Sequence, residues 1–198
     1  MKTIKVKVLF EDDVLGLCSG NPELHREYIA SKSGSREKED EEVEAIDVNE
    51  AFEKAMTVFP KMADGTPFFY DYQIRGFLKE AWGALKKVPG TQASKYKAYK
   101  KTIDNLVFVT PREIPLDMQG MKLDICERPL RASTPQGERI ALASSEYAPA
   151  GTSCEFEIMT LVDEYEDVIK ECLDYGVLKG MGQWRNSGKG RFKYEIIK

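Results

Sequence analysis

Three features of this 198-residue sequence predict an α+β fold with an antiparallel sheet. Lysines alternate with branched apolar residues over residues 2–10, which is the period of a strand. Three further strand patterns follow one another at 122–131, 139–147 and 152–160. A helical apolar stripe from Asp163 and a last strand at 191–197 close the sequence. Sequential strands interrupted by helices favour a ferredoxin-like (RRM-like) sheet with its helices on one face.

Helices are expected between these strands. The first is predicted to begin at Pro22, with Asn21 as its N-cap, and to continue to about Lys32. The second follows a capping box at Asp47-Val-Asn-Glu50 and is expected to continue until Pro60 stops it.

The middle of the chain is expected to continue with a short strand at 67–74 and a helix. The apolar face of that helix consists of Phe77, Leu78, Ala81, Trp82 and Leu85. The lysine-rich stretch 95–101 is expected to be helical and to precede a strand at 105–110. In the helix from Asp163, acids fill the first turn, and Gly176 is predicted to be the C-cap.

A length of 198 residues suits one domain or two small fused ones, and we expect a single domain, 1–198, that needs no disulfide or metal to fold. The four cysteines lie far apart and form no CxxC pair, so no metal and no cofactor is expected. The first residues have a strand period rather than the apolar run of a signal peptide. No stretch approaches the ~20 apolar residues that span a bilayer, so we expect a cytoplasmic protein without a membrane partner.

Charge is unevenly distributed around a net value of −4. Residues 37–50 hold eight acids and one lysine, and we expect an exposed, mobile acidic insertion at 33–46. Six lysines without an intervening acid occupy 86–101, and residues 178–198 hold six cations against Glu195. The acidic insertion therefore lowers the overall charge of a chain that carries two basic segments.

The segment between the last helix and the last strand is rich in glycine and cations. Its candidate RNA-binding residues are Gly180, Gly182, Trp184, Arg185, Asn186, Gly188, Lys189, Gly190 and Arg191. Glycines let a backbone approach phosphate closely, cations neutralise phosphate charge, and an exposed tryptophan offers a face to an unpaired base. A flexible connection with Trp184 packed on the core is the competing interpretation. The spacing fits neither a Walker loop nor a dinucleotide fingerprint.

This ending resembles that of the RAMP superfamily, the ferredoxin-like RNA-binding proteins of CRISPR systems, which close with a glycine-rich loop before their last strand. Three further segments are similar to effector-complex backbone subunits: Leu15-Gly-Leu-Cys-Ser-Gly, Tyr72-Gln-Ile-Arg-Gly-Phe-Leu-Lys-Glu-Ala-Trp and Ala148-Pro-Ala-Gly-Thr-Ser-Cys-Glu-Phe-Glu-Ile. The resemblance implies a non-catalytic RNA-binding subunit, or a stand-alone relative, with RNA and other subunits or copies of itself as partners. Phe77 departs from the family pattern, which has small hydroxyl residues there.

Arg75 and Lys79 lie one turn apart at the predicted start of a helix. Both could flank a phosphate drawn to the free amides and positive dipole at that end. A solvated helix face would carry the same residues, so this site is a hypothesis.

Two alternatives remain open from the sequence. Endoribonucleases of the same superfamily cut RNA without metal, and His25, the only histidine, would then be the catalytic acid or base. Asp12 and Asp13, after the first strand, match the position of a cleaving aspartate in some backbone subunits. The other alternative is a phage or mobile-element protein whose acidic insertion occupies a basic partner without binding RNA.

Overall fold

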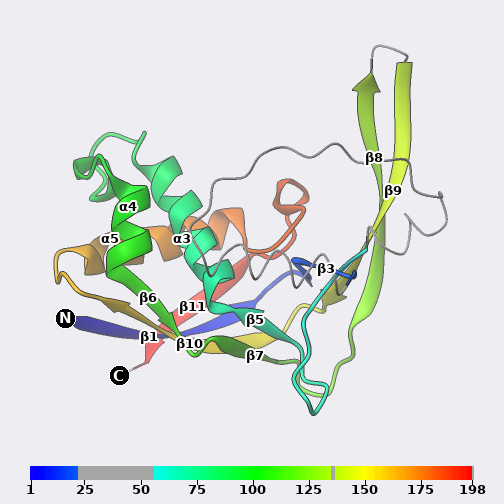
Figure 1. Ribbon diagram of the computed structural model, residues 1–198, viewed down its shortest axis with the longest axis horizontal. Coiled ribbons are helices and arrows are strands. Elements are labelled where there is room, and N and C mark those ends of the chain that lie inside the picture. The colour runs from blue at the N-terminus through cyan, green and yellow to red at the C-terminus, as the bar shows by residue number, and fades with distance from the viewer. Residues whose placement is uncertain (22–55, 135–136, 198) are drawn as a thin grey trace.

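The computed structural model describes residues 1–21, 56–134 and 137–197 (Figure 1). The helix predicted from Pro22, the acidic insertion at 33–46 and His25 lie outside these residues. Most of the helix predicted after Asp47 also lies outside them. Within the described part of the chain, no helix is long and apolar enough to cross a membrane.

A six-stranded antiparallel sheet forms the base of the molecule (Figure 1). Its strands lie in the order β11-β1-β10-β7-β5, and β6 also pairs with β10. Their bounds are β1 Lys2–Phe10, β5 Phe68–Tyr70, β6 Val107–Thr110, β7 Glu113–Asp117, β10 Ser153–Thr160 and β11 Phe192–Ile197. One face is covered by α3 (Asp71–Leu85), α4 (Tyr99–Leu106) and α5 (Tyr165–Lys179).

The order of elements along the chain explains this layering. After β1 come α3 and the strands β6 and β7, followed by β10, α5 and β11. The last strand pairs with β1, and β1 pairs with β10 on its other side, both antiparallel. This is the β-α-β-β-α-β arrangement of a ferredoxin-like fold, so the predicted fold class is confirmed.

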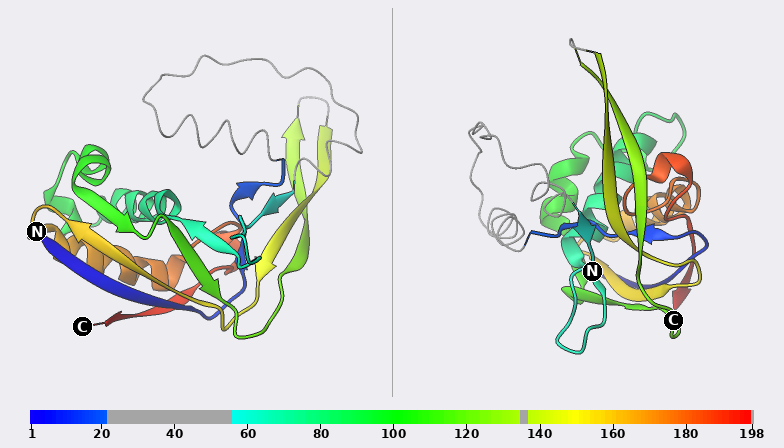
Figure 2. Two further views of the ribbon diagram at one scale, coloured as in Figure 1. Left: turned by 60° about the horizontal axis from the view of Figure 1, so that its bottom comes forward. Right: turned by 90° about the vertical axis from the view of Figure 1, so that its right-hand side faces the viewer.

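A long hairpin of β8 (Asp124–Thr134) and β9 (Gly137–Ala148) extends away from the helices and the main sheet (Figures 1 and 2). At its base, β9 pairs with β2 (Val14–Leu15) and with β4 (Thr57–Val58), and β4 pairs with β3 (Cys18–Ser19). The hairpin is therefore attached to the segment that directly follows β1.

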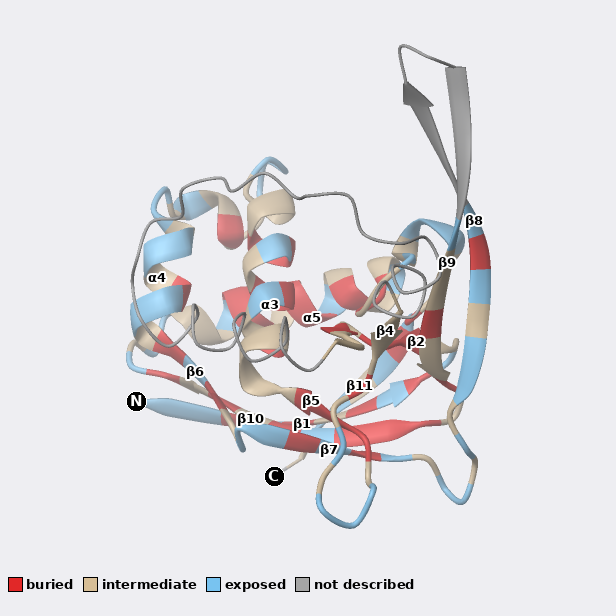
Figure 3. Cartoon of the chain, turned by 45° about the vertical axis from the view of Figure 1, so that its right-hand side comes forward, coloured by how far each residue is buried: buried red, intermediate tan, exposed pale blue. Residues whose placement is uncertain are grey.

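Alternation in β1 directs its apolar residues toward the helices. Ile4, Val6, Val8 and Phe10 are buried. The lysines between them lie on the opposite face of the sheet, because side chains alternate along a strand. In Figure 3, both the main sheet and the helices that cover it carry buried residues. Three of the four cysteines, Cys18, Cys154 and Cys172, lie in the buried part of the protein.

Burial raises the pKa of Cys154 to about 12, so this cysteine stays a neutral thiol at neutral pH.

Several boundaries predicted from the sequence are wrong. The strand expected at 105–110 begins at Val107, because α4 continues to Leu106. Two further boundaries show the reason. The strand expected at 67–74 ends at Tyr70, and α3 begins at Asp71 because the Gln73 side chain accepts the Tyr70 amide at 2.9 Å. Before Pro60, Thr57 and Val58 form a strand instead of a helix turn, since they pair with Ser19 and Cys18. Both errors come from partners that local periodicity does not reveal.

Gly176 is not the C-cap of the last helix. The helix α5 continues to Lys179, and Gly180 follows it with φ of 82°. Gly176 lies inside the helix at the point where α5 approaches two aromatic rings. A Cβ atom there would lie 2.5 Å from ring atoms of both Phe77 and Phe192. The glycine is needed for close packing between α3, α5 and β11.

A matched pair of glycine substitutions tests this packing. We expect Gly176→Ala to destabilise the protein by roughly 1–3 kcal/mol, because the methyl group would overpack a filled core. Gly76→Ala is the control, because Gly76 is an exposed helical residue and a Cβ atom added to it would meet nothing within 4 Å. It should stabilise by about 0.4–1 kcal/mol through reduced freedom of the unfolded chain. Urea unfolding measures the free energy of unfolding of both variants. Equal changes in this free energy would contradict a close contact of Gly176 with the two phenylalanine rings.

Candidate nucleic-acid interface

The glycine-rich loop, residues 180–191, connects α5 to β11 and is closed by backbone hydrogen bonds. The amide of Met181 donates to the carbonyl oxygen of Gly190 at 2.8 Å, and the amide of Gly190 donates to that of Asp13 at 2.8 Å. The second bond attaches the loop to the turn after β1. Four glycines have positive φ, with values of 82° at Gly180, 88° at Gly182, 84° at Gly188 and 73° at Gly190.

Gly190 makes the closest backbone approach in this loop. A Cβ atom on it would lie 1.8 Å from the carbonyl oxygen of Met181, a distance that no side chain can occupy. The sequence predicts that the glycines bring backbone near a phosphate. In the structure, Gly190 first serves to close the loop on itself.

Trp184 lies at the outer end of the loop rather than in the core. Its side chain is 38% exposed, whereas Trp82, the other tryptophan, is fully buried. Trp184 has φ of 54° and precedes the short turn η2 (Arg185–Ser187), and its carbonyl oxygen accepts the Ser187 amide at 3.1 Å. A left-handed backbone is costly for a non-glycine residue, so the loop holds this ring in a strained position.

The cations of the loop are paired with acids from other segments. Lys189 contacts Asp13 at 2.5 Å, and Arg191 contacts Asp12 at 2.7 Å. Arg185 contacts Glu80 of α3 at 2.8 Å. The hydrogen bond to Asp13 raises the pKa of Lys189, so its ammonium group stays charged at neutral pH. Lys179 donates to the side-chain oxygen of Asn186 at 2.6 Å.

Asp13 connects three segments that are distant in the sequence. Its carboxylate accepts from the Lys189 ammonium group and, at 3.2 Å, from the Ala150 amide. Its backbone carbonyl oxygen accepts from the Gly190 amide. In the sequence, Asp12 and Asp13 stand out only by their position after the first strand. In the structure, both form ion pairs with loop cations.

Arg75 and Lys79, the other predicted phosphate ligands, do not contact the loop. Arg75 pairs with Asp71 at 3.3 Å, and Lys79 pairs with Asp104 of α4. Glu80, one residue after Lys79, contacts Arg185. A one-residue step turns about 100° around a helix, so Lys79 and the loop lie on different sides of α3. Phe77, the departure from the family pattern, is buried against Phe192.

Sequence reasoning missed Arg128 of β8 and Gln183 of the loop. The guanidinium group of Arg128 donates to the Gln183 side-chain oxygen at 2.8 Å, and its central carbon lies 5.3 Å from the centroid of the Trp184 ring. Arg128 is only 8% exposed. No local pattern marks it, because its partners lie 55 residues away along the chain.

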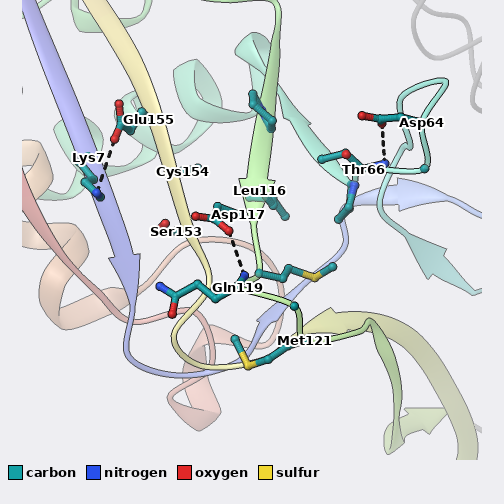
Figure 4. A pocket seen from close by; sticks show the side chains of 15 residues that line it. Lys7, Asp64, Thr66, Leu116, Asp117, Gln119, Met121, Ser153, Cys154 and Glu155 are labelled. Atoms are coloured by element: carbon teal, nitrogen blue, oxygen red, sulfur yellow. Dashed lines mark hydrogen bonds and ion pairs between the residues drawn. The ribbon is translucent and has the colours of Figure 1, made fainter.

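The face of the main sheet opposite the helices has a different character. It carries ion pairs of Lys5 and Lys7 with Glu155, at 3.7 and 3.6 Å, where RRM sheets carry aromatic residues that stack bases. An open pocket of about 710 Å³ on this face is lined by Lys7, Glu155, Asp117, Gln119 and other residues (Figure 4). Among the described residues, no group of three or more His, Cys, Asp or Glu side chains could hold a metal ion.

Fold and loop together define a ferredoxin-like protein with a closed glycine-rich loop between its last helix and last strand. Neither a family model nor a curated protein matches the sequence. A chain from the cryo-EM structure of the Type III-B Cmr-beta bound to cognate target RNA has a similar fold, with a TM-score of 0.56 and 13% identity. That match covers 99% of this chain and 60% of the other, so this chain spans about three fifths of the length of the Cmr-beta chain. A chain of a Type IV-B CRISPR complex matches with a TM-score of 0.48 and 10% identity over 99% of this chain and 90% of the other.

The closure of the loop predicts a difference between two of its glycines. Gly190→Ala should destabilise the protein by about 3 kcal/mol or more, since it combines a left-handed backbone with a steric clash. Gly188→Ala should cost roughly 1–2 kcal/mol, because its backbone is also left-handed but the nearest atom to its Cβ position is 3.9 Å away. Thermal unfolding measures both changes. Equal losses would show that the close approach at Gly190 is unimportant.

Proposed function

We propose that this chain is an RNA-binding protein of RAMP type, a non-catalytic subunit or stand-alone relative of a CRISPR ribonucleoprotein. The glycine-rich loop holds RNA phosphates, and other subunits or further copies of the chain are its protein partners. The observation that carries the proposal is an exposed, strained Trp184 held at the outer end of a closed loop that also presents Arg185, Lys189 and Arg191. A fold shared with a chain from an RNA-bound structure supports it.

Existing ion pairs do not prevent the loop cations from binding phosphate. The side chains of the Arg185–Glu80, Lys189–Asp13 and Arg191–Asp12 pairs are between 23% and 52% exposed. Exposed pairs are worth about 0–1 kcal/mol each, so a phosphate can replace the carboxylate with little loss. Until RNA arrives, the acids keep the cations in a defined arrangement, which lowers the entropy lost on binding.

The lysine-rich stretch would extend the RNA path beyond the loop. Lys87, Lys95, Lys97, Lys100 and Lys101 are exposed. Lys86 lies 5.4 Å from the centroid of the Tyr99 ring and donates to the carbonyl oxygen of Lys97 at 2.8 Å. This stretch begins at the C-terminal end of α3, the same helix whose Glu80 contacts Arg185 of the loop.

RNA binding is tested by fluorescence anisotropy with a labelled single strand of about thirty nucleotides at several salt concentrations. In the variant Arg185→Gln, Lys189→Gln, both charges are lost, but glutamine can still donate to Glu80 and Asp13. If each cation contacts one phosphate, the slope of log K against log salt should fall by about 1.4. Lys5→Gln, Lys7→Gln removes the same charge from the opposite face of the sheet and should bind like the wild type.

Three other outcomes would overturn the proposal. Equal losses in the two double variants would mean that only total charge matters. Cleavage of the RNA in EDTA that disappears in His25→Ala would favour a metal-independent endoribonuclease. No binding by folded wild type at low salt would favour a protein-interaction factor, which deletion of residues 35–45 would then test.

A further inference from the structure

Arg128 is a buried arginine with an unused hydrogen-bond donor. Its side chain is almost fully enclosed, with 8% exposure. Nη2 donates to Gln183, whereas Nη1 has no hydrogen-bond partner among the described residues. A buried charged donor without an acceptor is unfavourable, because the group has lost water and gained nothing in return. Within a candidate binding site, such a group is a position at which a ligand would supply the missing acceptor.

Trp184 lies against this guanidinium group. The distance of 5.3 Å between the guanidinium carbon and the ring centroid is typical of a cation–π contact. The indole retains 38% of its surface in solvent, so a second planar group can still stack on it. Trp184 also has a left-handed backbone, which is costly for a non-glycine residue, and such strain is common at binding sites.

We propose that Arg128, Gln183 and Trp184 form a subsite for one unpaired nucleotide of single-stranded RNA. The base stacks on the exposed surface of the Trp184 ring, and the phosphate of the same nucleotide accepts from Nη1 of Arg128. Arginine suits this role, because its planar guanidinium group stacks on aromatic rings and binds phosphate through directed donors. Arg185 and Lys189 then contact the neighbouring phosphates. This subsite deepens the proposed function and rests on it.

The subsite selects single strands over duplexes. A base inside a duplex is stacked on both faces and offers no surface to Trp184, whereas phosphates are present in both kinds of RNA. Nη1 is covered in the structure, so the phosphate reaches it only after neighbouring side chains shift.

Indole fluorescence tests the stacking directly, because Trp82 is fully buried and Trp184 is exposed. Single-stranded RNA should quench the emission of the wild type at the same concentrations at which anisotropy reports binding. The quenching should be absent in Trp184→Phe and with an oligomer whose nucleotides are abasic. Trp184→Ala should weaken binding of single-stranded RNA about tenfold or more and leave binding of a duplex of the same length unchanged.

Arg128 is tested by Arg128→Gln and Arg128→Lys, with Lys122→Gln as the control, since Lys122 is an exposed cation just before the same hairpin. Both changes at Arg128 should weaken single-strand binding about tenfold, because lysine keeps the charge but not the planar fork, and the control should bind normally. If Arg128→Gln fails to fold, Trp184→Phe and Trp184→Ala decide the question.

The outcomes separate this subsite from the function on which it rests. If the Arg185, Lys189 variant loses RNA but the Trp184 and Arg128 variants bind normally without quenching, the subsite is wrong and RNA binding by the loop stands. If the wild type binds no RNA, both proposals fail. If the Trp184 and Arg128 variants lose single-strand binding, and RNA quenches the tryptophan emission of the wild type, the subsite is supported.

Discussion

The close backbone contact between Gly190 and Met181 is the constraint on which the rest of the site depends. It joins the end of α5 to the start of β11, and the next hydrogen bond joins both to the turn after β1. Because the chain reverses here without a side chain at Gly190, Trp184 and its neighbours are displayed at the outer end of the loop. The last strand can then pair with β1 in the register that buries Phe192 against Phe10.

Acidic residues organise the positive charge of this loop. Asp12, Asp13 and Glu80 come from two separate segments, and each holds one loop cation. A net charge of −4 says little about the loop itself, because there each of the three cations is paired with one acid. Exposed pairs of this kind are weak enough to exchange a carboxylate for a phosphate, yet they order long side chains before a ligand arrives.

The second sheet contributes Arg128 to the site, a residue that lies outside the ferredoxin-like core. The hairpin of β8 and β9 is attached through β2 to the segment after β1, so its base lies beside the loop (Figure 1). From β8, Arg128 reaches Gln183 and the ring of Trp184. The proposed nucleotide subsite is thus built from two segments that are held together only by the way the two sheets meet.

Local sequence patterns were sufficient to predict the class of fold and to locate the glycine-rich loop. Alternation in 2–10, the strand patterns of 122–131, 139–147 and 152–160, and the glycines after α5 all express local backbone preferences, which a short window of residues reports. Tertiary structure alone decided that Gly176 packs against two phenylalanine rings and that Lys79 pairs with α4 instead of the loop. It also decided that the guanidinium group of Arg128 lies over the ring of Trp184. These features depend on contacts between distant segments, and periodicity carries no information about which segments become neighbours.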